Sequence, residues 1–234
     1  MKIFHHEFGH DYSTYSFGYA TYAELEPFED PALAYTAGFL PSSSDPAVRN
    51  RFYMARSVRV PVSAFSPSSE NRRVFKKFDG TFSMEFMSRD ELATDESFHT
   101  AFLEYFAKRH GKNIMSKERL NGILQTPLPL RGRHYRKDGM PAGYALEIAR
   151  EDWIHYWYPF YDLSYADTGF GMWLMLDAIR HAKGERRTYV YLGTAYGAKG
   201  RYKTNIEQLE WWDGNGWNTD RELLKKCIAG DAKH

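Results

Sequence analysis

The sequence predicts an α+β fold, on the evidence of two helical patterns and a series of strand patterns in its second half. From residue 131 the patterns run strand, strand, strand, helix, strand, helix, strand. This order describes an antiparallel sheet with one crossover helix and a closing strand. The chain of 234 residues is long enough to bury a substantial core.

The first forty residues are rich in aromatic side chains that suggest short extended segments. Tyr15, Phe17, Tyr19 and Tyr22 alternate imperfectly, and a loop of Pro and Ser follows at residues 41–46. These patterns predict further strands ahead of the main sheet.

A strand is expected around residues 59–65, because Val58, Val60 and Val62 fall on one face. Pro61 cannot donate a ladder hydrogen bond. Its presence favours an edge strand or a local irregularity.

Four positive charges lie close together within residues 66–80, namely Arg72, Arg73, Lys76 and Lys77. If this turn-initiated segment is helical, spacings of three and four bring these side chains together. Like charges at such spacings repel one another by about 0.2–0.5 kcal/mol per pair. The cluster therefore faces either solvent, as most charge runs do, or an anionic partner.

The clearest helical patterns lie at residues 96–110 and 167–183. The first carries a single apolar stripe and ends at Gly111, and the second is expected to begin with Asp167 as its N-cap. The other expected elements are a helix from Ser116, a hairpin turned at Lys137-Asp138-Gly139, strands at 154–162, 187–197 and around 209–214, and a helix near 219–228.

Composition excludes several classes of protein. With 43% hydrophobic and 26% charged residues, wholesale disorder is excluded. The net charge of +1 argues against a globally basic nucleic-acid binder but allows a local basic patch. A single cysteine, Cys227, rules out an intramolecular disulfide and a cysteine-cluster metal site. Because no apolar run approaches about 18 residues and the start lacks a signal-peptide core, we expect a cytoplasmic protein with no membrane partner.

A glycine-containing turn precedes the second helix, with the sequence Asp167-Thr168-Gly169-Phe170-Gly171. Such a helix start leaves N–H groups uncovered and favours an anion, and it resembles the turn on which GNAT-type N-acyltransferases hold the pyrophosphate of acetyl-coenzyme A. The Arg or Gln usual at the head of that motif is Ala166 here. A pair of glycines also permits close packing of helix on sheet, so both interpretations stay open.

Four potential metal ligands, His5, His6, Glu7 and His10, lie near the N-terminus. Segments of this kind are more often exposed and mobile, so we expect no metal site. The sequence also contains neither an HExxH motif nor a G-x-S-x-G nucleophile elbow. Nucleophilic catalysis by Ser or Cys is therefore unsupported.

Three passages, in collinear order, resemble a known family. RSVRVPVSAFSPSSENRRVFKKF at 56–78 is similar to the R-V-P-V-x-x-F-x-P-S-x-x-Q-R-R-V block of the aminoacyl-tRNA–protein transferases, the arginyl and bacterial leucyl transferases of the N-end rule pathway. Residues 105–148 resemble the family's passage of helix, R-H, Met, helix and hairpin. WYPFYDLSYADTGFGMWLMLDAI and TYVYLGTAYGAKGRYKTNIEQLEWWDGNGW resemble its F-Y-D-P, S-L-G-T and Y-V-Y-L-G blocks and its K-M-x-Y-K-x-x-x-x-P-x-E ending.

The resemblance implies a GNAT-like transferase domain at residues 91–234, with an antiparallel or mixed sheet flanked by helices. A smaller N-terminal lobe at residues 1–90 would carry the basic segment. The implied reaction moves an amino acid, of the arginine or leucine type, from charged tRNA to an amine. The acceptor would be the N-terminus of a protein or peptide, or a small molecule, and aminoacyl-tRNA would be a co-substrate in place of any cofactor.

The same resemblance assigns candidate residues. The tRNA backbone becomes the anionic partner of the basic segment, and the residues expected to bind it are Arg72, Arg73, Lys76, Lys77 and Lys199. The aromatic side chains of the expected substrate pocket suit stacking on the terminal adenine, although each is equally acceptable in a core. The pocket residues are Tyr158, Phe160, Tyr191, Thr194 and Tyr202.

Four residues are expected to serve catalysis: Tyr161, Asp162, Gly193 and Lys203. Asp162 would accept the amine proton or hold the ammonium group, unless it merely caps a turn at the strand end. Backbone groups around Gly193 would polarise the ester carbonyl. Lys203, in the family's Y-K pair, would neutralise the leaving ribose oxygen or a phosphate, unless it is a surface lysine.

The chain also departs from the family. The family's cysteines are absent, its S-L-G-T has become Asp167-Thr168-Gly169-Phe170, and the Met of its K-M-x-Y-K has become Gly200. A changed donor, a changed acceptor and a lost activity are all compatible with these departures. Two other functions stay open, an acyl-coenzyme A-dependent GNAT N-acyltransferase and a non-catalytic module that binds tRNA or a degron.

Overall fold

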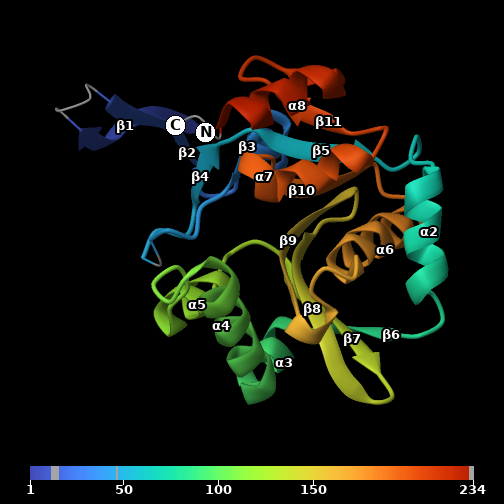
Figure 1. Cartoon of the computed structure of the whole chain (residues 1–234). Coiled ribbons are helices and arrows are strands. Elements are labelled where there is room, and N and C mark those ends of the chain that lie inside the picture. Colours follow the sequence, from blue (N-terminus) through green and yellow to red (C-terminus); the bar gives the residue numbers. More distant parts are fainter. Residues whose placement is uncertain (12–15, 46, 232–234) are drawn as a thin grey trace.

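A computed structural model describes residues 1–11, 16–45 and 47–231, and its strands form a smaller and a larger sheet (Figure 1). The smaller sheet has the order β1-β2-β4-β3, with β1 (Lys2–Asp11), β2 (Ser16–Glu24), β3 (Phe39–Pro41) and β4 (Arg51–Met54). The larger has the order β12-β11-β5-β10-β9-β8-β7-β6, with β5 (Ser57–Pro61), β6 (Ser83–Met87), β7 (Leu130–Lys137), β8 (Met140–Ala149), β9 (Trp153–Tyr161), β10 (Tyr189–Thr194), β11 (Glu210–Trp212) and β12 (Trp217–Asn218).

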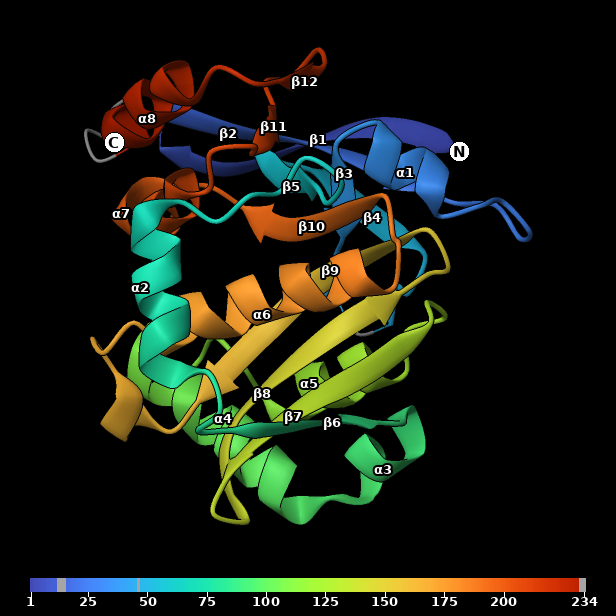
Figure 2. The same cartoon turned by 90° about the vertical axis from the view of Figure 1, so that its right-hand side faces the viewer.

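Helices cover both faces of the larger sheet. The helices of the described residues are α1 (Ala32–Thr36), α2 (Ser69–Phe78), α3 (Arg89–Thr94), α4 (Glu96–His110), α5 (Lys117–Leu124), α6 (Phe170–Gly184), α7 (Gly197–Gly200) and α8 (Arg221–Gly230), with the 3-10 helices η1 (Leu163–Tyr165) and η2 (Arg201–Asn205). Figure 2 shows α6 in front of the sheet, with α2 beside it, and α4 and α5 behind. In the described parts of the chain, no helix has the length and apolar character needed to cross a bilayer.

The expected strand order is confirmed for the centre of the larger sheet. Strands β7, β8 and β9 pair antiparallel, and α6 then crosses over so that β10 pairs parallel with β9. The hairpin between β7 and β8 turns at Asp138 and Gly139, both with positive φ, as a two-residue primed turn requires. The fold is therefore α+β with a mixed sheet.

The two strongest helical patterns are confirmed, with one correction at the start of α6. In α4, Asp95 caps the N-terminus, and Phe98, Phe102 and Phe106 are buried along one stripe. Asp167 does not cap α6, because the N-cap is Gly169, with a φ of 90° and no side-chain cap. The hydroxyl Oγ1 of Thr168 accepts from the N–H of Phe170 at 3.3 Å and so satisfies one of the free N–H groups at the start of the helix.

Of the two alternatives expected for the strand that contains Pro61, the edge strand is wrong, whereas its pairing with β10 does contain an irregularity, a register shift between Tyr191 and Thr194. β5 lies between β10 and β11 in the larger sheet. Pro61 is tolerated there because it is the last residue of β5, and the pairing with β11 involves Val58 and Arg59. Val58, Val60 and Val62 are all buried, as their alternation predicts.

The lobe boundary expected at residue 90 does not coincide with the sheets. Strands β5 and β6 both belong to the larger sheet, and α2 packs against α6. The smaller sheet ends with Met54, and the larger sheet begins at Ser57. Tyr15 lies outside the described residues, as do the side chains of Phe17 and Tyr19, so the alternation expected there is untested.

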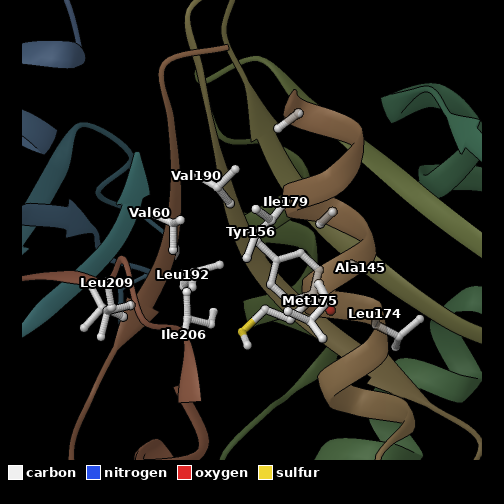
Figure 3. Packing of buried hydrophobic residues seen from close by; sticks show 14 of the residues in the cluster. Val60, Ala145, Tyr156, Leu174, Met175, Ile179, Val190, Leu192, Ile206 and Leu209 are labelled. Carbon is white, nitrogen blue, oxygen red and sulfur yellow. The ribbon is translucent and has the colours of Figure 1, made fainter. Parts of the chain in front are cut away.

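Two hydrophobic clusters hold the fold together. One lies between α6 and the sheet and includes Val60, Val190, Leu192 and Ile179 (Figure 3). The other joins α4 and α5 to the opposite face and to side chains of the first 55 residues. Each fully buried aliphatic side chain contributes about 1.5–3 kcal/mol, so these clusters fix the strand positions on which the site depends.

Candidate functional site

The candidate site begins where β9 and β10 separate. Their parallel ladder pairs residues 153–155 with 189–191 and ends at His155 and Tyr191, while β9 continues to Tyr161 and β10 to Thr194 (Figure 2). The pairing of β10 with β5 also shifts register between Tyr191 and Thr194. Gly193 lies in this irregular stretch with a φ of 77°, a conformation that suits glycine. We call this opening the fork, defined by residues 156–161 and 192–194.

A cavity of about 440 Å³ lies at the open end of the fork, within the size range of small-molecule sites. We call it cavity A. It is lined by the end of α4, the separated part of β9, the start of α6 and the segment after β10, specifically Tyr105, Phe106, Arg109, His110, Trp157, Tyr158, Pro159, Tyr161, Asp167, Gly169, Gly171, Met172, Lys199 and Tyr202. Four residues expected from the sequence meet here: Tyr158, Tyr161, Lys199 and Tyr202.

Cations outnumber carboxylates at the rim of cavity A, where Arg109 and Lys199 face one carboxylate, Asp167. Arg109 and Lys199 are both exposed, and Lys199 Nζ donates to the backbone oxygen of Arg109 at 3.3 Å, which joins α7 to α4. Partial burial, followed by the charges of Lys199 and Arg109, lowers the pKa of His110. The N-terminus of the 15-residue helix α6 faces the same cavity through Gly169 and Gly171. Such an arrangement favours an anionic ligand.

The two glycines at the start of α6 serve different purposes. A Cβ atom at position 171 would lie 2.9 Å from the ring of Tyr161, so glycine is needed there for close packing of helix on strand. A Cβ atom at position 169 would have no neighbour nearer than 4.0 Å, and glycine is favoured there by its positive φ. Of the two interpretations of this turn, Gly171 fits close packing.

Lys203 is buried, so it is not a surface lysine. Its side chain returns from η2 to the end of β10, and Nζ donates to the backbone oxygen of Thr194 at 2.5 Å. A Cβ atom at Gly193 would lie 3.7 Å from the same Nζ. Burial lowers the pKa of Lys203 to about 7. The structure therefore brings together Gly193, Thr194 and Lys203, three of the residues singled out in the sequence, at the end of β10.

A buried histidine lies at the point where the ladder between β9 and β10 ends. His155 Nδ1 is 2.9 Å from the hydroxyl of Tyr35. Burial, and then the positive charge of Lys203, lowers the pKa of His155 to about 3, so the imidazole is neutral. The positive charge of Lys203 therefore acts on a neutral imidazole and not on a second cation.

Gly193, Thr194 and Lys203 lie at the fork but are not among the residues that line cavity A, and three other expected residues do not reach it. Phe160 and Tyr191 are almost fully buried, Phe160 against Phe102 and Tyr191 against Tyr35, so the structure places both in the core. Asp162 is exposed and caps η1, where its Oδ1 accepts from Ser164 N at 2.8 Å. The capping alternative left open by the sequence thus describes its contact.

Asp162 borders a second cavity of about 360 Å³, which we call cavity B. It lies between α4 and the adjoining ends of β8 and β9, and Tyr105 and Tyr161 line both cavities. The complete lining is Ala101, Glu104, Tyr105, Lys108, Pro141, Ala142, Gly143, Tyr144, Phe160, Tyr161, Asp162 and Leu163.

The basic segment is helical, as its spacing suggests. Ser68 caps α2 by accepting from Asn71 N, and the four cations Arg72, Arg73, Lys76 and Lys77 are all exposed. Lys77 Nζ donates to the backbone oxygen of Thr168 at 2.7 Å, in the loop that leads into α6. The cluster on α2 therefore begins directly beside the rim of cavity A.

Comparison with known proteins assigns the family. Residues 69–204, more than half of the chain, match the acetyltransferase (GNAT) domain family. The chain belongs to this family. The match contains α2, α4, β7 to β10, α6 and Lys203, and hence the fork and the residues that line both cavities.

Curated relatives of this GNAT-domain protein are leucyltransferases. The chain is 28% identical over 178 residues to an aspartate/glutamate leucyltransferase from Dinoroseobacter shibae, which covers 69% of this chain and 61% of that protein. It is also 28% identical over 182 residues to one from Stenotrophomonas maltophilia, covering 71% and 70%. The chain is thus similar to curated leucyltransferases over about 70% of its length, at low identity. A solved structure of L-PGS from Bacillus licheniformis matches with a TM-score of 0.45 and 14% identity, over 72% of this chain and 52% of that one.

Sequence reasoning missed several residues that line cavity A, chiefly Arg109, His110, Trp157 and Met172. Arg109 and His110 looked like ordinary basic residues at the negative end of a helix. The family's R-H pair, which coincides with them, was the signal that marked them. In the described residues, no group of three or more His, Cys, Asp or Glu side chains is placed to hold a metal ion. The side chains of Glu7 and His10 lie outside the described residues, so the expectation for that segment stays a prediction.

Proposed function

We propose that this GNAT-domain protein transfers an amino acid from an aminoacyl-tRNA to an amine, such as a protein or peptide N-terminus. The observation that carries the proposal is the continuity of positive charge from α2 to cavity A, made by the contact of Lys77 with the loop before α6. A polyanion with a small acylated end matches a surface that leads from exposed cations into a cavity. Since charged tRNA is a cytoplasmic substrate, we propose the cytoplasm as the site of action.

In this proposal the tRNA backbone follows α2 and the aminoacylated 3′ end enters cavity A. Arg72, Arg73 and Lys76 neutralise phosphates, while Lys199 meets the chain nearer its end. Trp157, Tyr158 and Tyr202 offer aromatic faces in the cavity for the terminal adenine. The 28% identity to leucyltransferases makes leucine the first donor to test.

The reaction is an aminolysis of an ester. The amine nitrogen bonds to the ester carbonyl carbon, the bond from that carbon to the ribose oxygen breaks, the amine loses one proton and the ribose oxygen gains one. Lys203, in its charged form, stabilises negative charge that develops on oxygen during these steps. Asp162 receives the amine proton on the side of cavity B. Orientation of the two substrates can supply about 7–11 kcal/mol, and because the ester is already activated, no cofactor is required.

The direct test is a screen of charged tRNAs. Purified protein is incubated with tRNA charged with leucine, with arginine or with a mixed pool, and with a set of peptides that differ in their first residue. Mass spectrometry should detect peptides extended by one amino acid, and Lys203→Met should abolish the signal. Absence of transfer from every pool would contradict the proposal.

An acyl-coenzyme A-dependent acyltransferase is the second candidate, because the N-terminus of α6 faces cavity A. Saturable binding of coenzyme A, lost when a side chain is placed at Gly169, would favour it. Tight, salt-sensitive tRNA binding without turnover would instead indicate a non-catalytic tRNA-binding protein.

A further inference from the structure

The two cavities carry opposite charges. Two exposed cations, Arg109 and Lys199, outnumber one exposed carboxylate, Asp167, around cavity A, and the N-terminus of α6 faces the same cavity. Carboxylates predominate in cavity B, where Glu104 and Asp162 face a single cation, Lys108. Lys108 is the ion-pair partner of Glu104, with Nζ 3.1 Å from Oε2.

Asp162 is the unpaired charge of cavity B. Its Oδ1 accepts a backbone N–H, and among the described residues no cation forms an ion pair with it. A carboxylate offers about four lone-pair sites on two oxygens, so the cap leaves Oδ2 able to accept further hydrogen bonds. The side chain is exposed, and a ligand that enters from solvent reaches it without displacing a protein partner.

The cavities meet at two tyrosines. The rings of Tyr105 and Tyr161 line both, with centroids 5.3 Å apart. Tyr161 is held by the close approach of Gly171, and Tyr105 is fixed on α4. The two cavities therefore adjoin at this pair of rings, so that a group at the edge of cavity B can meet a group at the edge of cavity A.

We propose that cavity B receives the amine acceptor and that its carboxylates select an acceptor whose first residue is neutral or basic. The proposal rests on the transferase function proposed above. An ammonium group complements Glu104 and Asp162, whereas an acidic first residue would place a third carboxylate among them. Like charges at this range repel, and weak screening in a partly enclosed cavity increases the effect. The relatives named for aspartate and glutamate would then differ from this chain in acceptor.

The experiment uses peptides that are identical except for a first residue of Lys, Ala or Asp. The value of kcat/KM for each is measured at saturating aminoacyl-tRNA. The Lys and Ala peptides should exceed the Asp peptide by about tenfold, corresponding to about 1.4 kcal/mol. The ratio of Lys to Asp should fall as salt is added.

Glu104→Gln should reduce the ratio of Lys to Asp several-fold, and Glu104→Lys should reverse it. The matched control is Glu96→Gln, which removes the same charge from an exposed position of α4 outside the cavity and should leave the ratio unchanged. Asp162→Asn provides a second variant, because an Asn side chain caps η1 as well as Asp does.

Two results would overturn the inference, and they are distinguishable. If the Asp peptide is accepted as well as the Lys peptide and neither Glu104→Lys nor Asp162→Asn alters the ratio, cavity B does not select the acceptor, while transfer itself stands. If no peptide is extended by the wild-type protein, the proposed function fails along with the inference.

Discussion

Buried Lys203 and the exposed cations of α2 carry the same charge in opposite surroundings. Lys203 is 8% exposed at the end of β10, and its pKa is lowered to about 7. The four cations of α2 lie in solvent on a helix that packs its other side against α6. Burial by itself therefore points to a role for Lys203, whereas a role for the cations of α2 has to be inferred from what lies next to them.

Burial of a charged amine costs free energy of folding, so a buried lysine is expected mainly where a ligand or a reaction uses it. Desolvation disfavours the charged form, and the contact of Lys203 with Thr194 replaces part of the lost hydration. Groups in such surroundings are concentrated at functional sites. Exposed cations stay hydrated and cost little free energy, so their presence alone does not indicate a function. The position of the α2 cluster beside cavity A does.

The largest effect is expected for Lys203→Met. Transfer should fall about 10³-fold, because the charge that stabilises the developing oxyanion is lost. The variant should nevertheless be more stable than the wild type at pH 7, by several kcal/mol at about 1.36 kcal/mol per pKa unit. Transfer rates and urea unfolding measure the two effects. If activity falls because stability falls, Lys203 is a packing residue.

The pH dependence of the Lys203→Met difference sharpens this test. The pKa of Lys203 is near 7 in the folded protein and about 10.4 in the unfolded chain, so between these values the unfolded chain binds more protons. The stability of the wild type should therefore rise from pH 7 to pH 10, and the advantage of the variant should disappear over that window. An advantage that stays constant with pH would contradict a buried, depressed lysine.

A smaller effect, about 10²-fold, is expected for Asp162→Asn. The amide keeps the cap on η1 but cannot accept the amine proton. Affinity for tRNA should stay the same, as measured by fluorescence anisotropy. An equal loss of transfer and tRNA binding would assign Asp162 a structural role. The buried Lys203 would then be a better candidate for catalysis than the exposed Asp162.

Removal of exposed cations should affect binding without affecting stability. For Arg72→Ala/Arg73→Ala, the affinity for tRNA should fall and the slope of log K against log salt should decrease by about 0.7–0.9 per lost phosphate contact. The free energy of unfolding should stay within about 0.5 kcal/mol of the wild type. Lys225→Ala/Lys226→Ala on α8 removes two charges far from α2 in sequence and should leave the slope unchanged. Identical slopes for both pairs would make the α2 cluster a solvated face.

The smallest effect is expected for Lys77→Ala. It removes one exposed hydrogen bond to Thr168 and should cost about 1 kcal/mol of stability or less. It should reduce the salt dependence of tRNA binding by one contact. A slope equal to that of the wild type would show that Lys77 fastens α2 to the loop and does not meet tRNA.

The sequence predicted those parts of the fold that local pattern controls. The apolar stripe of α4, the primed turn at Asp138 and Gly139, and the crossover through α6 depend on spacing and turn chemistry within a short stretch. The position of β5 between β10 and β11 depends on strands about 130 and 150 residues later in the chain, where no local pattern applies.

For the site, residue type was easier to predict than environment. Tyr158 and Tyr202 line cavity A while Tyr191 does not, although all three looked alike as aromatic residues of expected strands or turns. Tyr191 is buried because its face of β10 meets the core, and a shift of one residue along the strand would exchange the two faces. The burial of Lys203 was equally invisible, because its neighbours in sequence are polar or exposed.

The positions of the side chains at the fork depend more on the number of residues between Tyr191 and Lys203 than on the identity of most of those residues. The β9–β10 ladder ends at Tyr191, and β10 is irregular through Gly193 before η2 brings back Lys203. Deletion of one residue from 192–202 would turn the following side chains away from the fork, whereas many single replacements there would keep the path of the chain. In a collection of natural variants, we therefore expect insertions or deletions between Tyr191 and Lys203 to be rare, and substitutions there to fall outside Gly193 and the residues that line cavity A.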